Sequence, residues 1–578
     1  KGKNPLALYR PMEVRFLKAL IITLLLVVLP GKGLYAQSFN VDSALSAMTL
    51  EEKIGQLFMV AAYSNKGEEH HADLEQLVNE YHIGGVIVMQ GGPERQKKLL
   101  NRLQSAASTP LLVGQDAEWG QAMRLDSTYK FPTSLTVGAA GGGMDAYDLG
   151  HALARECSAV GVHMSFSPVL DVNTNPGNPI IGARSFGSDP NRVNALGVEV
   201  VKGIQAQGVL ACGKHFPGHG DTQQDSHKTL PKVDRTLKEL MEVEWVPFKG
   251  AIDAGVSAIM IAHLNIPSIE PSGKPTSLSH KVINGILREQ WGYDGLVITD
   301  ALNMKGAAAF APPGELELEA FAAGNDILLF PMDVPKATEA FVAATATDKI
   351  SIKSIDERVR RILVAKSNSM AYADWLEAQK PADAKLLASD HGPFEREDEN
   401  QRVSFNLIRN AATLLETGAT PFPIKNLEQD FLHIAIGDFE SAGTVKQYLD
   451  RYQEMPHHHG VDVDDSEMAS KDAFVVSFHQ NIKNPWKRYK LESYEQEFLR
   501  RLSATGKPVY LLHFANPYGV LTYPSLGENV RILVMYENNE YAQLLAPQFL
   551  FGARKTKGTL PVDLRQWGAA GDGQKTEE

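Results

Sequence analysis

The chain has 578 residues, of which 43% are hydrophobic and 22% are charged. This composition is typical of a globular protein and not of a disordered one. Because one domain usually holds about 100–250 residues, the length predicts two domains. The formal net charge of −12 argues against nucleic acid or an anionic membrane surface as the main partner, because both attract basic surfaces.

The first 36 residues have the pattern of an export signal. Arg15 and Lys18 supply positive charge, and the apolar run 19–30 that follows is too short to span a bilayer comfortably. Ala36 is a small residue of the kind after which such a signal is cleaved. We therefore expect residues 1–36 to be a signal peptide and the mature protein to be exported, periplasmic or secreted, with no membrane attachment. An uncleaved membrane anchor is the alternative.

The sequence contains two cysteines, Cys157 and Cys212. An exported protein could join them in a disulfide. However, Cys212 lies in an apolar run and Cys157 in a helical pattern, so we expect two buried, unpaired thiols.

Short apolar runs recur between helical stretches from residue 37 to about residue 370. They are apolar on both faces, which is typical of buried parallel strands in β/α units. The eight runs span residues 56–62, 85–89, 110–116, 162–168, 209–216, 257–264, 296–301 and 326–330. Eight such units predict an α/β fold with an N-terminal (β/α)8 barrel of the TIM type. An open doubly wound sheet would show the same pattern and is the alternative.

Polar side chains follow several of these runs at their carboxyl ends. In a barrel these ends meet at one face, which is where active sites of such barrels lie. The residues in question are Asp116, Asp171, Lys214, His215, His263, Asn265 and Asp300. The sequence therefore predicts a site at that face.

Beyond the barrel, the polar composition of residues 371–401 indicates a linker. A smaller α/β sandwich domain is expected over residues 402–566, with apolar runs at 431–436, 474–478, 509–514 and 532–536. The Gly-rich, charged residues 567–578 are expected to be a disordered tail. For His457–His459 we favour a solvated loop over a metal site.

The stretch KHFPGHGDTQQDSH, residues 214–227, concentrates imidazoles and carboxylates at one strand end. Its proline and glycines exclude a regular helix, so His215 and His219 are not a helical metal pair. Asp225 and His227 lie two residues apart, and in an irregular loop the carboxylate can orient the ring for proton transfer near neutral pH. Zinc binding by this cluster is the alternative.

Asp300 ends the apolar run at 296–301. A lone Asp at such a position is often a helix N-cap. Together with the Asp225–His227 pair, however, it completes the minimum set for a retaining glycosidase, namely one carboxylate and one acid/base.

These motifs resemble those of glycoside hydrolase family 3, specifically its β-N-acetylglucosaminidase branch. Residues 214–227 resemble that branch's loop, in which an Asp-Ser-His segment replaces the Glu acid/base of other members. VITDALNM at 297–304 resembles the nucleophile motif, residues 116–124 the Asp-x-Glu-Gly-Gly-x-Val-x-Arg block, and residues 184–187 the Arg-x-Phe-Gly block. The resemblance covers residues 49–366. Trp119 departs from it, because the family often has Gly there, and we expect this side chain to reshape the pocket or stack on a second sugar.

The resemblance implies a role for each matching residue. Asp300 would be the nucleophile, His227 the general acid/base, and Asp225 the residue that orients His227. The implied sugar contacts are Asp116, Arg124, Arg184, Lys214 and His215. No metal or organic cofactor is required, and no residue after 401 is expected in the pocket.

The expected function is therefore release of terminal β-linked N-acetylglucosamine from peptidoglycan fragments or chito-oligosaccharides. The expected partner is a carbohydrate substrate, with no nucleic acid, and the sequence does not indicate an oligomeric state. A family 3 β-glucosidase or xylosidase and an N-acetylglucosaminide phosphorylase are alternatives. A non-catalytic sugar-binding protein and a metal-dependent hydrolase are alternatives of other classes.

Overall fold

The computed structural model describes residues 39–225, 228–380, 397–480 and 490–576. The expected signal peptide lies outside these residues. Within them, no helix is both long enough and apolar enough to cross a membrane. Residues 41–578 belong to one compact unit, in which two sheets form.

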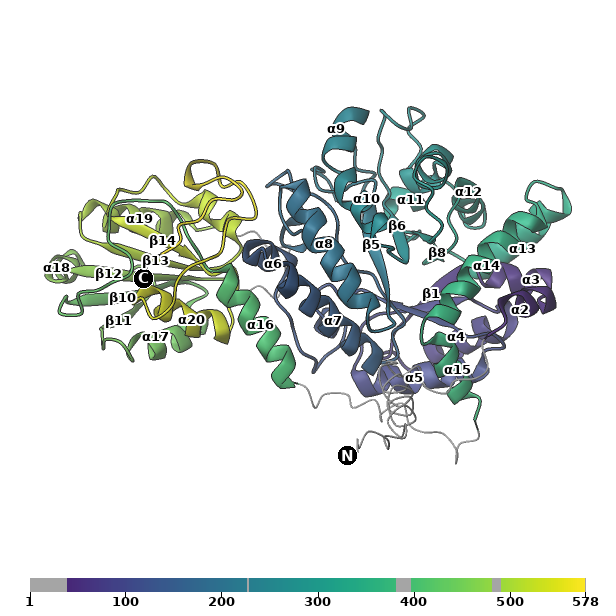
Figure 1. The fold of residues 1–578 in the computed structure, drawn as a ribbon, viewed down its shortest axis with the longest axis horizontal. Helices are drawn as coiled ribbons and strands as arrows, with labels where there is room; N and C mark the ends of the chain where they lie inside the picture. Colours follow the sequence, from purple (N-terminus) through teal and green to yellow (C-terminus); the bar gives the residue numbers. More distant parts are fainter. Residues whose placement is uncertain (1–38, 226–227, 381–396, 481–489, 577–578) are drawn as a thin grey trace, which may run out of the picture. The chain divides into compact units, whose positions relative to one another are not determined.

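The first sheet has eight parallel strands that close into a ring, and helices surround it (Figure 1). Its members are β1 (Phe58–Ala62), β2 (Gly85–Val88), β3 (Leu112–Gln115), β4 (Met164–Ser165), β5 (Leu210–Phe216), β6 (Ala258–Ile261), β7 (Leu296–Thr299) and β8 (Leu328–Leu329). They pair in the order β7-β6-β5-β4-β3-β2-β1-β8, and a parallel bridge from Ile298 to Ile327 closes the ring. The predicted barrel is thus confirmed, and the open-sheet alternative is wrong.

Helices cover the outside of the ring and bury the second face of each strand, which is why these strands are apolar throughout. The larger ones are α4 (Glu68–Tyr81), α5 (Pro93–Ala106), α7 (Gly143–Ala159), α8 (Pro190–Gln205), α10 (Trp245–Asp253), α12 (Glu315–Ala323), α13 (Val334–Ala346) and α14 (Ile352–Asn368). Capping side chains and prolines mark the first residues of several of these helices. Asp189, for example, accepts a hydrogen bond from Asn191 N at the start of α8, and Pro190 occupies the first turn.

The second sheet has six strands, β9 (Thr413–Leu414), β10 (Phe431–Gly437), β11 (His457–His459), β12 (Ala473–His479), β13 (Val509–Phe514) and β14 (Val530–Val534). Their order is β11-β10-β12-β13-β14-β9, and only β9 pairs antiparallel. Alternate side chains of the strands belong to two different apolar clusters. One cluster includes residues of α17 (Gly443–Leu449) and α20 (Glu540–Leu550), and the other includes residues of α19 (Ser493–Ala504). This is the α/β sandwich expected after the barrel.

Both cysteines are buried and free, as predicted. The loop expected at His457–His459 is wrong, since these residues form β11 and pair in parallel with β10. An edge strand can be polar, because charged and polar side chains protect an exposed edge. Its sequence therefore lacks the apolar alternation by which a strand is recognised.

The predicted disorder of the tail is also wrong for residues 568–576. Gly571 has φ +100, a backbone conformation open to glycine, and it turns the chain so that its own N–H donates to Leu560 O. Gln574 then bridges antiparallel to Leu414 and extends the sheet. The glycines that suggested disorder are the residues that make this turn.

Two helices occupy parts of the segment read as a linker. In α15 (Ala371–Ala378), Trp375 Nε1 donates to Ala107 O over 2.8 Å and so fastens the helix to the barrel. In α16 (Glu397–Ala411), Glu399 accepts a hydrogen bond from Arg155 of α7. Residues 381–396 lie outside the described part of the chain.

Candidate active site

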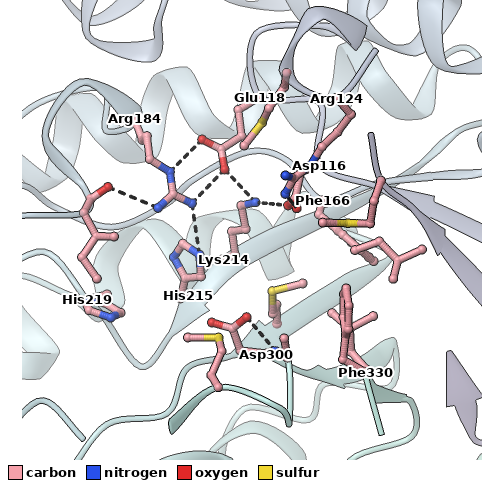
Figure 2. Close-up of a pocket in the computed structure, with 18 of the residues that line it drawn as sticks. Asp116, Glu118, Arg124, Phe166, Arg184, Lys214, His215, His219, Asp300 and Phe330 are labelled. Atoms are coloured by element: carbon pink, nitrogen blue, oxygen red, sulfur yellow. Dashed lines mark hydrogen bonds and ion pairs between the residues drawn. The ribbon is translucent and has the colours of Figure 1, made fainter. Parts of the chain in front are cut away.

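A cavity of about 370 Å³ opens at the carboxyl ends of the barrel strands. Its volume lies in the usual range for a small-ligand site, about 300–1,000 Å³. Charged side chains in β5 and after β3 and β7 line it, together with an apolar wall (Figure 2). Among the described residues, all those that line it belong to the barrel: Tyr63, Ile87, Met89, Asp116, Glu118, Met123, Arg124, Phe166, Ile180, Ile181, Arg184, Lys214, His215, His219, Met260, Asp300, Ala301, Asn303, Met304, Leu329 and Phe330.

Two carboxylates and three cations form a connected group on one side of the cavity. Lys214 Nζ lies 2.7 Å from Asp116 Oδ1 and 2.7 Å from Glu118 Oε1. Asp116 also pairs with Arg124. Arg184 holds Glu118 through two parallel hydrogen bonds, Nε to Oε2 at 2.9 Å and Nη2 to Oε1 at 2.8 Å, a geometry that fixes both side chains.

These charges decide the protonation of the group. Burial by itself would raise the pKa of Asp116, but the positive charges of Lys214 and Arg124 outweigh it and hold that pKa well below its usual range. Burial also opposes ionisation of Glu118, whose pKa Arg184 and Lys214 lower to about 2. Both carboxylates are therefore ionised at neutral pH and can accept hydrogen bonds from a ligand.

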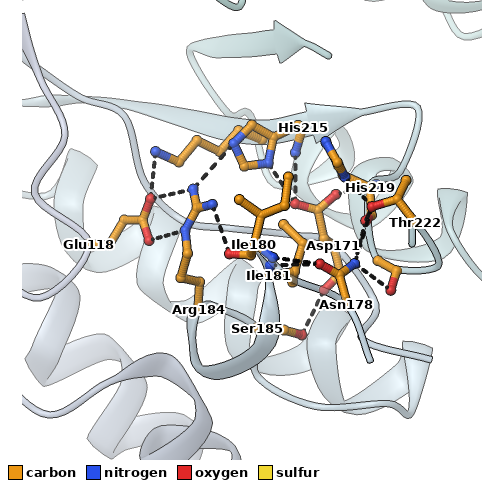
Figure 3. A network of polar contacts seen from close by, with 12 residues as sticks. Glu118, Asp171, Asn178, Ile180, Ile181, Arg184, Ser185, His215, His219 and Thr222 are labelled. Carbon is orange, nitrogen blue, oxygen red and sulfur yellow. Dashed lines mark hydrogen bonds and ion pairs between the residues drawn. The ribbon is translucent and has the colours of Figure 1, made fainter. Parts of the chain in front are cut away.

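A second polar network holds His215 in place (Figure 3). The Asp171 carboxylate is fully buried and lies 2.7 Å from His215 Nδ1. It also accepts hydrogen bonds from the backbone N–H groups of His215, at 3.2 Å, and His219, at 2.7 Å. Because a carboxylate can only accept, Nδ1 of His215 carries a proton. Nε2 is then an acceptor, and Arg184 Nη2 donates to it over 3.3 Å.

His219 lies beside this network and is neutral. Burial lowers the pKa of its imidazole to about 4. Its Nδ1 lies 2.7 Å from Thr222 Oγ1, and its carbonyl accepts a hydrogen bond from Asn178 Nδ2 over 2.9 Å. These contacts hold the start of the loop that follows β5.

Asp300 follows β7 and lines the cavity, on the side opposite Glu118 and Arg124 (Figure 2). Its backbone N–H donates to Ile261 O at 2.8 Å, and its Oδ1 accepts from Ala301 N at 2.8 Å. The helix that follows, α11 (Lys305–Ala308), has Met304 at its N-cap. Asp300 is therefore not the cap of that helix, which removes the structural alternative for this carboxylate.

The predicted acid/base pair is described only in part. Asp225 is half-buried on the loop after β5, where its carbonyl accepts a hydrogen bond from Thr229 N at 3.1 Å. Its carboxylate lies 3.9 Å from Lys228 Nζ, and it is not among the residues that line the cavity. His227 lies outside the described residues.

Residues 49–365, more than half of the chain, match the family model described as glycosyl hydrolase family 3 N terminal domain. The chain belongs to glycoside hydrolase family 3. It is 29% identical over 460 residues to "Beta-hexosaminidase A" of Pseudoalteromonas piscicida, covering 72% of this chain and 75% of that protein. It is 33% identical over 322 residues to "Beta-hexosaminidase" of Chromobacterium violaceum, covering 52% and 89% respectively. The solved structure of a family 3 β-N-acetylglucosaminidase from Paenibacillus sp. str. FPU-7 is 31% identical, with a TM-score of 0.71, over 90% of this chain and 99% of that one.

The family 3 cavity brings together Asp300 and all five residues predicted as sugar contacts. Two residues that the structure places at the site were assigned no specific role from the sequence. Glu118 is the Glu of the Asp-x-Glu block at 116–124, but the block by itself does not show that this carboxylate is buried between Arg184 and Lys214. Asp171 follows a predicted strand, but its pairing with His215 joins residues 44 positions apart. Trp119, expected to reshape the pocket, is half-buried and is not among the lining residues.

Four methionines contribute to the apolar wall of the family 3 cavity. They are Met89, Met123, Met260 and Met304, and their thioethers can adapt to an irregular apolar surface. Over the part of the chain that the structure describes, no group of three or more His, Cys, Asp or Glu side chains could hold a metal ion.

Proposed function

We propose that this family 3 protein is a retaining β-N-acetylglucosaminidase that releases terminal β-linked N-acetylglucosamine. One observation carries the proposal: Asp300 lies in one cavity with the ionised group formed by Asp116, Glu118, Arg124, Arg184 and Lys214. This arrangement offers a carboxylate for a sugar's anomeric carbon and charged donors and acceptors for its hydroxyls. The relatives named β-hexosaminidase and the related β-N-acetylglucosaminidase structure support the same activity.

The reaction would proceed in two steps. Asp300 attacks the anomeric carbon while protonated His227, oriented by Asp225, gives its proton to the leaving oxygen, so that the glycosidic bond breaks and an ester forms. Neutral His227 then takes a proton from water, which attacks the same carbon and displaces Asp300. Two inversions leave the product with retained β configuration.

The charged group would hold the sugar ring. Asp116 and Glu118 accept hydrogen bonds from hydroxyls, and Arg124 and Lys214 donate to ring substituents. Hydrogen bonds to charged partners are the stronger kind. Because cations surround both carboxylates and hold their pKa values low, these acceptors would remain ionised throughout the pH range in which an imidazole can work as acid and base.

We further propose that the protein is exported and acts on peptidoglycan fragments or chito-oligosaccharides. The apolar run at 19–30 with its basic flank supports export. The net charge of −12 argues against a polyanion such as nucleic acid as the ligand.

The test compares nitrophenyl β-glycosides of N-acetylglucosamine and glucose, in buffer with and without inorganic phosphate. We expect turnover of the N-acetylglucosamine substrate to be at least ten-fold faster in kcat/KM, about 1.4 kcal/mol in transition-state binding. Proton NMR should show the β-anomer of N-acetylglucosamine as the first product. A preference for glucose, an α-anomeric product or a sugar phosphate as the main product would each contradict the proposal.

A further inference from the structure

We propose that the second domain positions the active site, through Tyr518 and the backbone of Pro561, which together hold the barrel segment 171–188. This segment carries Arg184 into the cavity and Asp171 against His215. The inference rests on the proposed function, because it assigns the segment to sugar binding. Tyr518 is a positioning residue here, since it contacts the segment and does not line the cavity.

Tyr518 reaches the segment through one buried hydrogen bond. Its hydroxyl oxygen accepts from Asn173 Nδ2 over 2.7 Å, and both residues are buried. The backbone N–H of Asn173 in turn donates to Gly187 O over 2.9 Å. A single hydroxyl of the second domain is thus tied to both ends of the segment.

The backbone of Pro561 forms the second contact. Its carbonyl accepts a hydrogen bond from Ser188 N over 2.9 Å. A Cβ placed on Gly187 would lie 2.2 Å from that carbonyl oxygen, and Gly187 has φ +149, so only glycine allows the two domains to approach this closely. The nearby Ser185 hydroxyl donates a hydrogen bond to Asp171 O over 2.7 Å. This bond links the Pro561 contact to the polar network around His215.

A barrel helix provides an independent connection to the same segment. At the start of α6 (Ser134–Ala140), Thr133 N and Thr136 Oγ1 donate to Glu537 Oε1 of the second domain, over 2.9 and 2.8 Å. The helix also contributes Leu135 to the apolar cluster of that domain. At Gly138 a Cβ would lie 1.9 Å from Phe186 O, so the helix packs closely against residues 184–187, which include Arg184.

A shift of the segment would change the cavity at two points. Arg184 holds Glu118 and faces His215 Nε2, and Asp171 sets the proton of His215. Asp300 follows β7, where its backbone N–H donates to Ile261 O and its Oδ1 accepts from Ala301 N. Loss of the Tyr518 hydroxyl should therefore weaken sugar binding and leave the chemical step on an activated substrate nearly unchanged.

The experiment compares Tyr518→Phe with Tyr523→Phe in the full chain. Tyr523 belongs to the same apolar cluster, but its hydroxyl lies 2.6 Å from His513 Nδ1 and so pairs within the second domain. Each variant removes one buried hydroxyl. On the nitrophenyl glycoside that the wild type cleaves best, one measures kcat, KM and the inhibition constant of N-acetylglucosamine, with the melting temperature alongside.

We expect both variants to lower the melting temperature to a similar extent. Tyr518→Phe alone should raise KM and the inhibition constant about three- to ten-fold, because part of the cost of leaving one buried donor unpaired would fall on sugar binding, with kcat changed less than two-fold. Asn173→Ala removes the same hydrogen bond from the barrel side, and the double variant should be no worse than either single one.

Three outcomes would overturn the inference. They are a folded Tyr518→Phe protein with wild-type KM and inhibition constant, an equal rise of both constants in Tyr523→Phe, and additive effects in the double variant. If Tyr518→Phe fails to fold, Asn173→Ala against the same control decides alone. Absence of N-acetylglucosaminide turnover in the wild type would refute the proposed function, whereas the ratio of variant to wild type on the preferred glycoside tests the positioning separately.

Discussion

The Asp171 carboxylate lies 2.7 Å from Nδ1 of His215 and determines how that ring faces the cavity. With Nδ1 protonated toward Asp171, Nε2 is an acceptor directed at Arg184, 3.3 Å away. Burial alone would raise the pKa of Asp171, but its contacts with His215 outweigh burial and lower that pKa. One carboxylate that does not touch the cavity thus connects the strand ends of β4 and β5 with the Arg184 segment.

Asp171→Asn should weaken both folding and sugar binding. The amide would present an N–H where His215 and His219 need an acceptor, and breaking such a buried pair costs about 3 kcal/mol. We expect the free energy of unfolding, measured in urea, to fall by about that amount, and KM to rise at least ten-fold. Asp126→Asn is the matched control, since Asp126 pairs with Arg95 at the surface and should change the free energy by less than about 0.5 kcal/mol. Equal effects of the two variants would show that the buried Asp171–His215 pair stabilises the protein no more than a surface pair does.

Glu118→Gln should reduce kcat/KM about a hundred-fold, the order expected when charge-assisted hydrogen bonds inside a site are lost. The side chain keeps its shape but no longer balances Arg184 and Lys214. Steady-state kinetics on the N-acetylglucosamine substrate measures the loss. As control, Glu94→Gln removes the partner of Lys97 at an exposed position and should retain full activity. If Glu118→Gln keeps more than half of the wild-type kcat/KM, Glu118 does not take part in sugar binding.

Stability should fall on acidification because of buried neutral histidines. Burial lowers the pKa of His513 to about 4, whereas its unfolded value is near 6.5. Below pH 6.5 the unfolded state binds the proton first, so the contribution of His513 is complete above that pH and is lost as pH falls toward 4. That loss is at most about 3 kcal/mol for one fully buried histidine.

The measurement is urea unfolding at pH 7.5, 6 and 4.5. His513→Gln should be less stable than the wild type at pH 7.5, because its contacts to Tyr523 and Asn516 are lost. It should nevertheless lose less stability than the wild type between pH 7.5 and 4.5. Parallel pH curves for the two proteins would contradict the assignment.

His227→Ala should harm substrates with poor leaving groups selectively. A sugar leaving group needs a proton, whereas a nitrophenolate hardly does. We expect kcat/KM on N,N′-diacetylchitobiose to fall at least a hundred-fold more than on the nitrophenyl glycoside. Equal losses on both would remove His227 as the general acid.

How far the sequence predicts the fold depends on the kind of signal. The runs at 209–216 and 296–301 are buried on both faces, and such continuous apolar runs predict strands without knowledge of their partners. β11 and the turn at Gly571 depend on pairing with β10 and Leu414, and no local pattern reports a pairing. For this reason the barrel was predictable, while the polar edge strand and the ordered tail were not.

The site shows the same division. Asp116, Arg124 and Lys214 could be assigned because they stand in motifs with fixed spacing. The role of Glu118 depends on burial between two cations, and that of Asp171 on a residue 44 positions away. The support from Tyr518 crosses 345 positions and comes from the second domain, which local spacing cannot reveal.

The proposed reaction requires that Asp300 form the covalent bond to the sugar. The most direct test incubates the protein with a fluorinated N-acetylglucosaminyl donor that carries a dinitrophenyl leaving group, so that the glycosyl-enzyme is hydrolysed slowly and accumulates. Mass spectrometry of the digested protein should find one added sugar, on the peptide that contains Asp300, and Asp300→Asn should acquire none while remaining folded. A sugar attached to another peptide, or turnover of Asp300→Asn above about a tenth of the wild-type rate, would rule out Asp300 as the nucleophile.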